Sequence, residues 1–126
     1  MKIIGDFHIH SKYSRATSRE MDIEHLEKWA RIKGIKVLGT GDFTHPLWLK
    51  ELKENLEPRE PGLFVFKKNH YQNNNNNNFF NHTPAESPVR FILTSEISCI
   101  YSKNNRTRKI HIVVFAPDFQ TVEKIN

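Results

Sequence analysis

Short apolar runs alternate with amphipathic segments over the first 56 residues, and this alternation limits the folds that the chain can adopt. The run MKIIGDFHIH predicts a strand, because two isoleucines lead into a segment of alternating side chains. A helix is expected over about 18–33, where Thr17 and Glu20 form a capping box and apolar residues recur every three to four positions. Gly34 then supplies the stop for this helix.

A second strand and a second helix repeat this order. IKVLGTGDF is typical of a buried parallel strand that ends in glycine-punctuated polar residues. The helix that follows is expected to begin with Thr44 as its cap and Pro46 in its first turn. Its apolar side would consist of Leu47, Leu52 and Leu56. Strands that alternate with helices in this way predict an α/β fold.

The alternation lapses between about 57 and 88. Prolines and a glycine interrupt the chain there, and LFVFKK is a candidate short strand. NHYQNNNNNNFFNHTPAESP has no apolar periodicity, so we expect a low-complexity surface insertion at about 67–88. His70 and His82 flank the asparagine run, but a segment of this composition is a poor scaffold for a metal ligand.

Two further apolar runs flank a basic turn. VRFILTSEIS predicts a buried strand that ends at Glu96, and KIHIVVFAP predicts another strand with His111 near its start. If the two runs pair as an antiparallel hairpin with an even-numbered loop, Glu96 and His111 share a face as opposite or diagonal neighbours. An odd-numbered loop would put them on opposite faces. A third helix begins near Thr121.

Length and cysteine content limit the classes of protein to which the chain can belong. The 126 residues suffice for one small domain. No run approaches the roughly 20 apolar residues of a membrane span, and the N-terminus lacks the apolar core of a signal peptide. Cys99 is the single cysteine and fits a buried apolar position better than a nucleophile, which favours a reducing cytoplasm.

A net charge of +5 permits a polyanionic partner. The segment SKNNRTRK concentrates this charge, since it contains Lys103, Arg106, Arg108 and Lys109 and no acid. Such a run fits either a solvated loop or a contact with nucleic acid.

Side chains with metal-ligand chemistry follow the ends of several predicted strands. His8 and His10 would project from one face of the first strand, Asp42 follows the second, and Glu96 ends the third. His111 joins them if the hairpin loop is even-numbered. His-x-His alone would also fit an edge strand with solvated histidines. Several ligand-type positions at strand ends favour a metal cluster instead.

A cluster of imidazoles and carboxylates predicts phosphoester chemistry. Zinc, manganese and iron bind these ligands, and a carboxylate between two ions can bridge them. Such ions polarise a phosphate and lower the pKa of a bound water to about 7, so the nucleophile is the metal-bound water and no protein nucleophile is needed. Asp6, two residues before His8, is a candidate to orient a histidine ligand by a hydrogen bond without itself binding the metal.

Four motifs carry a family resemblance. GDFHIHSKYS, GTGDFTHP, LTSEIS and HIVVFAP resemble, in order and spacing, the first motifs of the PHP (polymerase and histidinol phosphatase) superfamily. More narrowly, the chain resembles the N-terminal part of archaeal-type endonuclease Q proteins, except in the asparagine-rich insertion. The resemblance implies a distorted (β/α)7 TIM-like barrel with two or three divalent metals. It also implies nicking of DNA on the 5′ side of deaminated bases such as uracil and hypoxanthine, and at abasic sites.

The resemblance also implies roles for individual residues. His8 and His10 match the opening His-x-His pair of the family, Glu96 matches the bridging carboxylate, and His111 matches the histidine ligand that follows. Asp42 falls in the motif that most PHP proteins read as Thr-Asp-His.

Two departures from the family pattern bear on the number of metals. Phe43 stands where the histidine of the second motif is expected, and His45 either substitutes for it or simply fits a helix N-terminus. Arg15 and Ala16 stand where many PHP proteins have an acid or a histidine. Both departures concern the third metal position, so the resemblance favours a dinuclear site over a trinuclear one.

PHP barrels need about twice this length, and later strands supply further ligands, so the chain is expected to be the first half only of a partial barrel. The C-terminal half of that domain and DNA are its candidate partners. Three functions stay open at this point. The first is a metal-dependent endonuclease for damaged DNA, or a truncated piece of one, with the basic run holding phosphates. The others are a phosphatase for a small phosphorylated metabolite and an inactive gene fragment.

Overall fold

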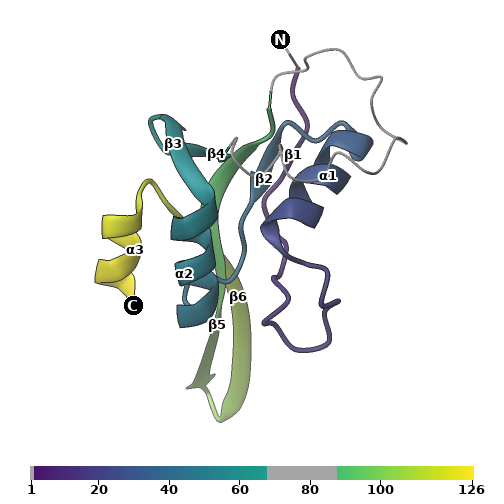
Figure 1. Cartoon of the computed structure of the whole chain (residues 1–126). Helices are drawn as coiled ribbons and strands as arrows, with labels where there is room; N and C mark the ends of the chain where they lie inside the picture. Colours follow the sequence, from purple (N-terminus) through teal and green to yellow (C-terminus); the bar gives the residue numbers. More distant parts are fainter. Residues whose placement is uncertain (1, 68–87) are drawn as a thin grey trace.

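The computed structural model describes residues 2–67 and 88–126, so most of the predicted insertion, with His70 and His82, lies outside the described residues. The elements are β1 (Gly5–Asp6), α1 (Ile23–Lys33), β2 (Val37–Gly39), α2 (Pro46–Asn55), β3 (Leu56–Glu60), β4 (Leu63–Phe66), β5 (Arg90–Lys103), β6 (Arg106–Ala116) and α3 (Phe119–Ile125) (Figure 1). The mixed α/β architecture that the alternation predicts is confirmed. Within the described ranges, no helix is long and apolar enough to cross a membrane.

The six strands form one sheet in the order β1-β2-β5-β4-β3, and β6 pairs with β5 outside this path. The pairs β1–β2 and β2–β5 are parallel, whereas β3, β4 and β6 join by antiparallel pairing. The parallel pairing of β5 with β2 ends at Ile92, and its pairing with β6 begins at Leu93. Beyond this point β5 leaves the central sheet. With β6 it forms a two-stranded ribbon that projects from the body of the molecule (Figure 1).

The first helix begins later than predicted. Its N-cap is Asp22, whose carboxylate accepts a hydrogen bond from the His25 backbone N–H at 3.0 Å. The predicted cap, Thr17, instead donates its hydroxyl to the carbonyls of Ser11 and Ser14, because the segment before the helix folds into a loop of its own. The predicted stop at Gly34 is confirmed, with φ of 72° at the C-cap.

The second helix also differs in detail from the prediction. Pro46 is its first residue, but the N-cap is His45, and the hydroxyl of Thr44 lies 3.3 Å from that of Ser95 instead of capping the helix. Leu47 is exposed, whereas Trp48 and Leu52 are the buried residues of this helix.

Two strands differ from the sequence-based prediction. Leu56 is the C-cap of the second helix and the first residue of β3. This strand was not predicted, because its other residues are charged or proline. The first strand is confined to Gly5–Asp6, so segment 7–10 runs beside β2 without regular strand pairing. Cys99 is only partly buried on β5, because this part of the strand belongs to the projecting ribbon.

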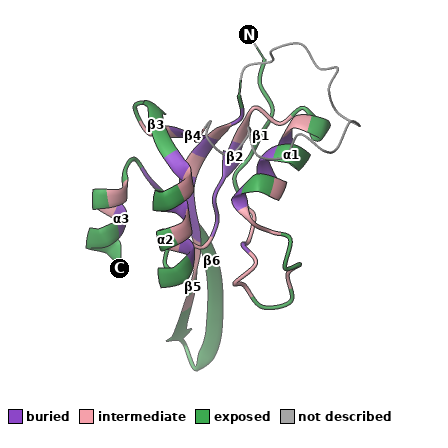
Figure 2. Cartoon of the chain, viewed as in Figure 1, coloured by how far each residue is buried: buried purple, intermediate pink, exposed green. Residues whose placement is uncertain are grey.

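The hydrophobic core joins the helices to the centre of the sheet. Its buried members include Leu38, Phe43, Trp48, Leu52, Phe64, Phe91, Leu93 and Val122. Burial follows the central strands and the inner sides of the helices, while the distal ribbon is exposed on both strands (Figure 2). Phe43, which stands where the resemblance leads to the expectation of a histidine, is fully buried in this core.

A turn at 40–43 connects β2 to the start of α2 and is fastened to both β5 and α2. The Thr40 backbone N–H donates to the Ile92 carbonyl at 2.9 Å, and the Gly41 N–H donates to Thr94 Oγ1 at 2.9 Å. The buried indole of Trp48 donates to the carbonyls of Thr40 and Gly41, at 3.1 and 2.9 Å. These four hydrogen bonds hold the main chain of the turn in one place.

The turn also needs glycine where it passes segment 7–10. Gly41 has φ of +64°, and a Cβ added there would lie 2.4 Å from the carbonyl oxygen of Ile9. Gly34 offers a comparison, because it has a similar φ of +72° but no atom within 4 Å of an added Cβ.

Replacement of Gly41 by alanine should therefore cost more than replacement of Gly34. Both changes place a Cβ on a left-handed residue, at about 1 kcal/mol or somewhat more. Only Gly41→Ala also forces the Ile9 backbone aside, which adds roughly 1–3 kcal/mol. Urea denaturation of the two variants measures the difference in the free energy of unfolding. Equal losses would show that the close approach at Ile9 does not matter.

Candidate metal centre

Three imidazoles converge on one carboxylate. Glu96 Oε2 lies 2.6 Å from His8 Nε2 and 3.1 Å from His10 Nε2, and Glu96 Oε1 contacts His111 Nδ1. The His8 and His10 rings meet edge to face, with centroids 5.6 Å apart. The predicted grouping of these four residues is therefore what the folded chain brings together.

The ribbon register explains how His111 reaches Glu96. Lys103 pairs with Arg106, so the loop is the two residues Asn104 and Asn105, both with positive φ near 55°. The loop is even-numbered, and Glu96 lies opposite Val113, two residues from His111. Glu96 and His111 are thus diagonal neighbours on one face, as the even-loop alternative required.

Asp42 lies behind this cluster. Its Oδ1 is 3.1 Å from His10 Nδ1, the ring nitrogen that faces away from Glu96. Its Oδ2 accepts two hydrogen bonds from Ser11, from the backbone N–H at 2.6 Å and from the hydroxyl at 2.8 Å. Ser11 is fully buried. Ser11 was not predicted from the sequence, because its position directly after the His-x-His pair is the only sequence signal for its role.

Two other candidates lie away from the convergence point. His45 stacks on Tyr13, with ring centroids 4.6 Å apart and 15° between the planes. Its Nδ1 is buried without a hydrogen-bond partner among the described residues. The Asp6 carboxylate accepts from the main-chain N–H of His8 at 3.3 Å, so its contact is with the backbone of this residue.

The electrostatics favour an ionised carboxylate at the centre. Hydrogen bonds from His8 first, and then from His111, lower the pKa of Glu96 to about 2. The side chain of Glu96 is 16% exposed, whereas those of His8 and His111 are 55% and 56% exposed. The carboxylate is therefore enclosed by its histidines, and the outer side of the cluster stays open to solvent.

This donor set fits divalent metals. One ligand atom from each of His8, His10 and Glu96 lies within 4.8 Å of the others, the one such group of three or more within residues 2–67 and 88–126. The ligand atoms of one tetrahedral ion at about 2.0–2.2 Å are separated by roughly 3.4 Å. The contacts of Glu96 Oε2 with His8 and His10, at 2.6 and 3.1 Å, would therefore have to open slightly to admit an ion. The two oxygens of Glu96 face different histidines, which is the arrangement of a carboxylate that bridges two ions.

The basic hairpin lies at the far end of the same ribbon. Its four cations are exposed, and none pairs with a carboxylate within the described part of the chain. Strand alternation divides them by side: Lys103, Arg106 and Arg108 project from one side of the ribbon. Lys109 projects from the other side, which is the side of Glu96.

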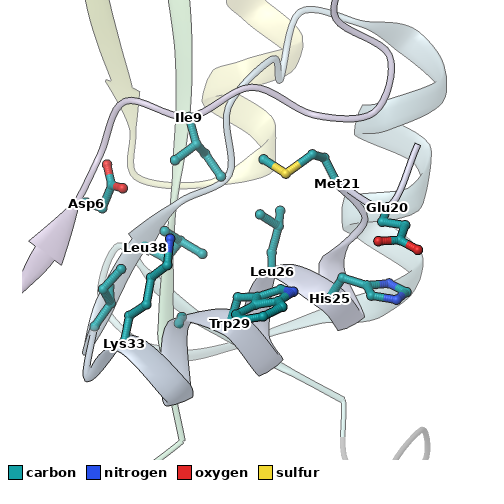
Figure 3. A pocket seen from close by; sticks show the side chains of 11 residues that line it. Asp6, Ile9, Glu20, Met21, His25, Leu26, Trp29, Lys33 and Leu38 are labelled. Atoms are coloured by element: carbon teal, nitrogen blue, oxygen red, sulfur yellow. The ribbon is translucent and has the colours of Figure 1, made fainter. Parts of the chain in front are cut away.

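A pocket of about 390 Å³ lies on α1 beside β1 and β2 (Figure 3). Its floor is apolar, and its polar lining consists of Asp6, Glu20, His25 and Lys33. Ile9 points into this pocket, whereas the neighbouring His8 and His10 contact Glu96. The pocket and the histidine cluster therefore lie on opposite sides of segment 7–10.

The depressed pKa of Glu96 predicts a pH dependence of stability in metal-free protein. Because the folded pKa of about 2 lies below the ordinary 4.5, the stabilisation is present above about pH 4.5 and is lost as the pH falls toward 2. Thermal unfolding of wild type and Glu96→Gln across this range measures it. The gap between the two midpoints should narrow with falling pH, and a constant gap would contradict the assignment.

Comparisons with known proteins place this geometry in context. No protein-family model matches the chain. The uncharacterized protein MJ0043 of Methanocaldococcus jannaschii is 47% identical over 49 residues, which are 39% of this chain and 6% of that protein. The lesion-specific endonuclease PfuEndoQ of Pyrococcus furiosus is 30% identical, with a TM-score of 0.67 over 97% of this chain. Endonuclease Q in complex with a 27-mer duplex substrate with an abasic lesion is also 30% identical, with a TM-score of 0.66 over 96%.

The chain spans 24% of the length of each of these two solved chains. Nearly every residue of the present chain is nevertheless covered, at the same identity in both comparisons. The mixed α/β fold with its six-stranded sheet is similar to endonuclease Q, and the resemblance to this group of PHP-superfamily enzymes, indicated by the four motifs, is confirmed.

Proposed function

We propose that this chain is part of a metal-dependent phosphodiesterase that nicks DNA at deaminated or abasic sites. One observation carries the proposal: three imidazoles from two separate segments converge on Glu96. They do so in a chain whose fold is similar to that of a lesion-specific endonuclease. The similarity supports a nuclease-like function, and the duplex with an abasic lesion bound by the second neighbour suggests the substrate class.

His8, His10 and one oxygen of Glu96 would hold one divalent ion, and the other oxygen of Glu96 with His111 would hold a second. Zinc, manganese and iron all suit this donor set. When bound, such ions polarise a phosphodiester and make a coordinated water nucleophilic near neutral pH. Glu96 stays ionised across the working pH range because its histidine partners depress its pKa, so it is ready to bind cations. His8 and His111, both more than half exposed, leave the outer side open to a phosphate.

The parallel unit β1-α1-β2-α2 followed by β5 supports the further proposal that the fold is part of a (β/α)7 barrel. In such a barrel, functional residues gather at the carboxyl ends of the parallel strands. His8 and His10 follow β1, Asp42 follows β2, and Glu96 lies just beyond the parallel part of β5. The C-terminal half of such a domain is the proposed source of further ligands.

The ribbon is the proposed contact for the DNA backbone. Its exposed cations can neutralise phosphates, a sequence-independent interaction that weakens with salt. Lys109 shares the side of Glu96, so it would contact the strand next to the metal centre. Arg106 and Arg108 face the other way and would contact phosphates at a distance from the cleavage position. An extended cationic strip of this kind favours a polymer substrate over a small phosphorylated metabolite.

His8→Ala should abolish nicking of a duplex that carries one deoxyuridine or abasic site, in buffer with manganese or zinc. The reason is the loss of one imidazole from the group that encloses Glu96. His25→Ala is the matched control, because this histidine pairs with Asp22 on α1, away from the cluster. Gel analysis of end-labelled oligonucleotides measures both variants, and the control should nick at the wild-type rate.

Wild-type protein that takes up metal and leaves all lesion duplexes intact would contradict the nuclease proposal. Rapid hydrolysis of a generic phosphomonoester by the same preparation would then favour a phosphatase. If metal-free wild type and Arg108→Ala bind the duplex with the same affinity and the same salt dependence, this side of the ribbon is not a DNA contact.

A further inference from the structure

We infer that Asp42 is a positioning residue that fixes the tautomer of His10, so that the proton sits on Nδ1 and the Nε2 lone pair points into the cluster. This inference rests on the proposed metal function, because it concerns a histidine proposed as a ligand. It differs from the sequence-based prediction, in which Asp42 was itself a metal ligand.

The hydrogen bonds around Asp42 determine which atoms donate. A backbone N–H can only donate, so the 2.6 Å contact makes Oδ2 an acceptor from Ser11. The Ser11 hydroxyl accepts from the Tyr13 N–H at 3.2 Å, which leaves its own proton for the same Oδ2 at 2.8 Å. Oδ1 is the remaining oxygen, and it faces His10 Nδ1 at 3.1 Å. A carboxylate has no proton to donate, so it can only accept at this contact.

The donor at this contact must therefore be His10. His10 faces a second carboxylate through Nε2, which lies 3.1 Å from Glu96 Oε2, but only the Asp42 contact has hydrogen-bond geometry, and Glu96 Oε2 already pairs with His8 at 2.6 Å. A neutral imidazole that donates from Nδ1 carries its lone pair on Nε2. The Ser14 hydroxyl is the other contact of Nδ1, at a longer 3.4 Å, and it can accept from the same N–H. Metal-bound histidines commonly donate their second nitrogen to a carboxylate in this way, which sets both tautomer and ring orientation.

The backbone shows that Asp42 is held for this contact. Asp42 itself has φ of +47°, directly after Gly41 at +64°, and the turn is fastened by Thr94 and Trp48. Left-handed geometry at a non-glycine residue persists only where the surrounding structure enforces it. The Asp42 side chain is 16% exposed, so water competes little for its oxygens.

An amide at position 42 should reverse the tautomer without changing the shape of the side chain. The Ser11 N–H needs an acceptor, so the carbonyl oxygen of the asparagine would face Ser11. Its NH2 group would then face His10 and donate to Nδ1. The ring proton would move to Nε2, and the lone pair needed by a metal would be lost from the cluster.

The experiment compares wild type, Asp42→Asn and Ser11→Ala as full chains. In metal-free, 15N-labelled protein at about pH 8, where an unperturbed imidazole is neutral, long-range 1H–15N correlations report the tautomer of His10. We expect Nδ1–H in wild type and Nε2–H in Asp42→Asn. Zinc affinity, measured by competition with a chelator, should fall about 10–100-fold in Asp42→Asn. Ser11→Ala removes only one hydrogen bond to Oδ2, so it should keep the wild-type tautomer and most of the affinity.

Three results would overturn the inference. The first is an Nε2–H tautomer in wild type, which needs no variant and so does not depend on how well Asp42→Asn folds. The second is lost zinc affinity in Asp42→Asn with the tautomer unchanged, which would make Asp42 a direct ligand. The third is a reversed tautomer with undiminished zinc affinity. If wild type binds no metal, the proposed function fails, while the tautomers of the metal-free proteins still decide what Asp42 does to His10.

Discussion

The turn at 40–43 is the constraint on which the rest of the site depends. It is fastened to β5 through Ile92 and Thr94 and to α2 through the indole of Trp48. It also passes so close to segment 7–10 that only glycine fits at position 41. Because the histidine segment has no regular strand pairing beyond Asp6, this contact and the hydrogen bonds of Asp42 are what place His10.

The second constraint is the continuity of β5. One strand first pairs in parallel with β2 in the core and then pairs with β6 as the exposed ribbon. Glu96 lies just beyond this change, so the buried part of β5 places the carboxylate while the ribbon brings His111 to it. The same ribbon carries the four cations at its tip. The two-residue turn at Asn104 and Asn105 determines the register of the β5–β6 pair. This register places His111 beside Glu96 and decides on which side of the ribbon each cation projects.

The fold class and the shared face of Glu96 and His111 could be predicted from the sequence, because their signals are local. Alternation of periodicities predicts the mixed fold, and the parity of the hairpin loop predicts that Glu96 and His111 share a face. The start of α1 was mistaken because Thr17 and Asp22 are both good caps, and local preference cannot tell which one the loop uses elsewhere. β3 was missed because its side chains look like a surface loop until β4 is beside it.

The supporting residues of the site were harder to predict, because they depend on contacts between distant segments. Asp42 was found as a polar residue after a strand, but its hydrogen bonds to Ser11 and His10 exist only once β1 and β2 are side by side. The stacking of His45 on Tyr13 is likewise a tertiary contact, and no spacing in the sequence distinguishes a stacked histidine from a ligand.

Anomalous diffraction from crystals of the chain grown with zinc would show whether Glu96 is the centre of a metal site. We expect zinc within about 2.0–2.2 Å of Nε2 of His8 and His10 and of a Glu96 oxygen. A second ion at the other Glu96 oxygen, next to His111, would establish the bridge. Zinc bound at the surface pair of His25 and Asp22, with none at Glu96, would show that Glu96 is not the centre of a metal site.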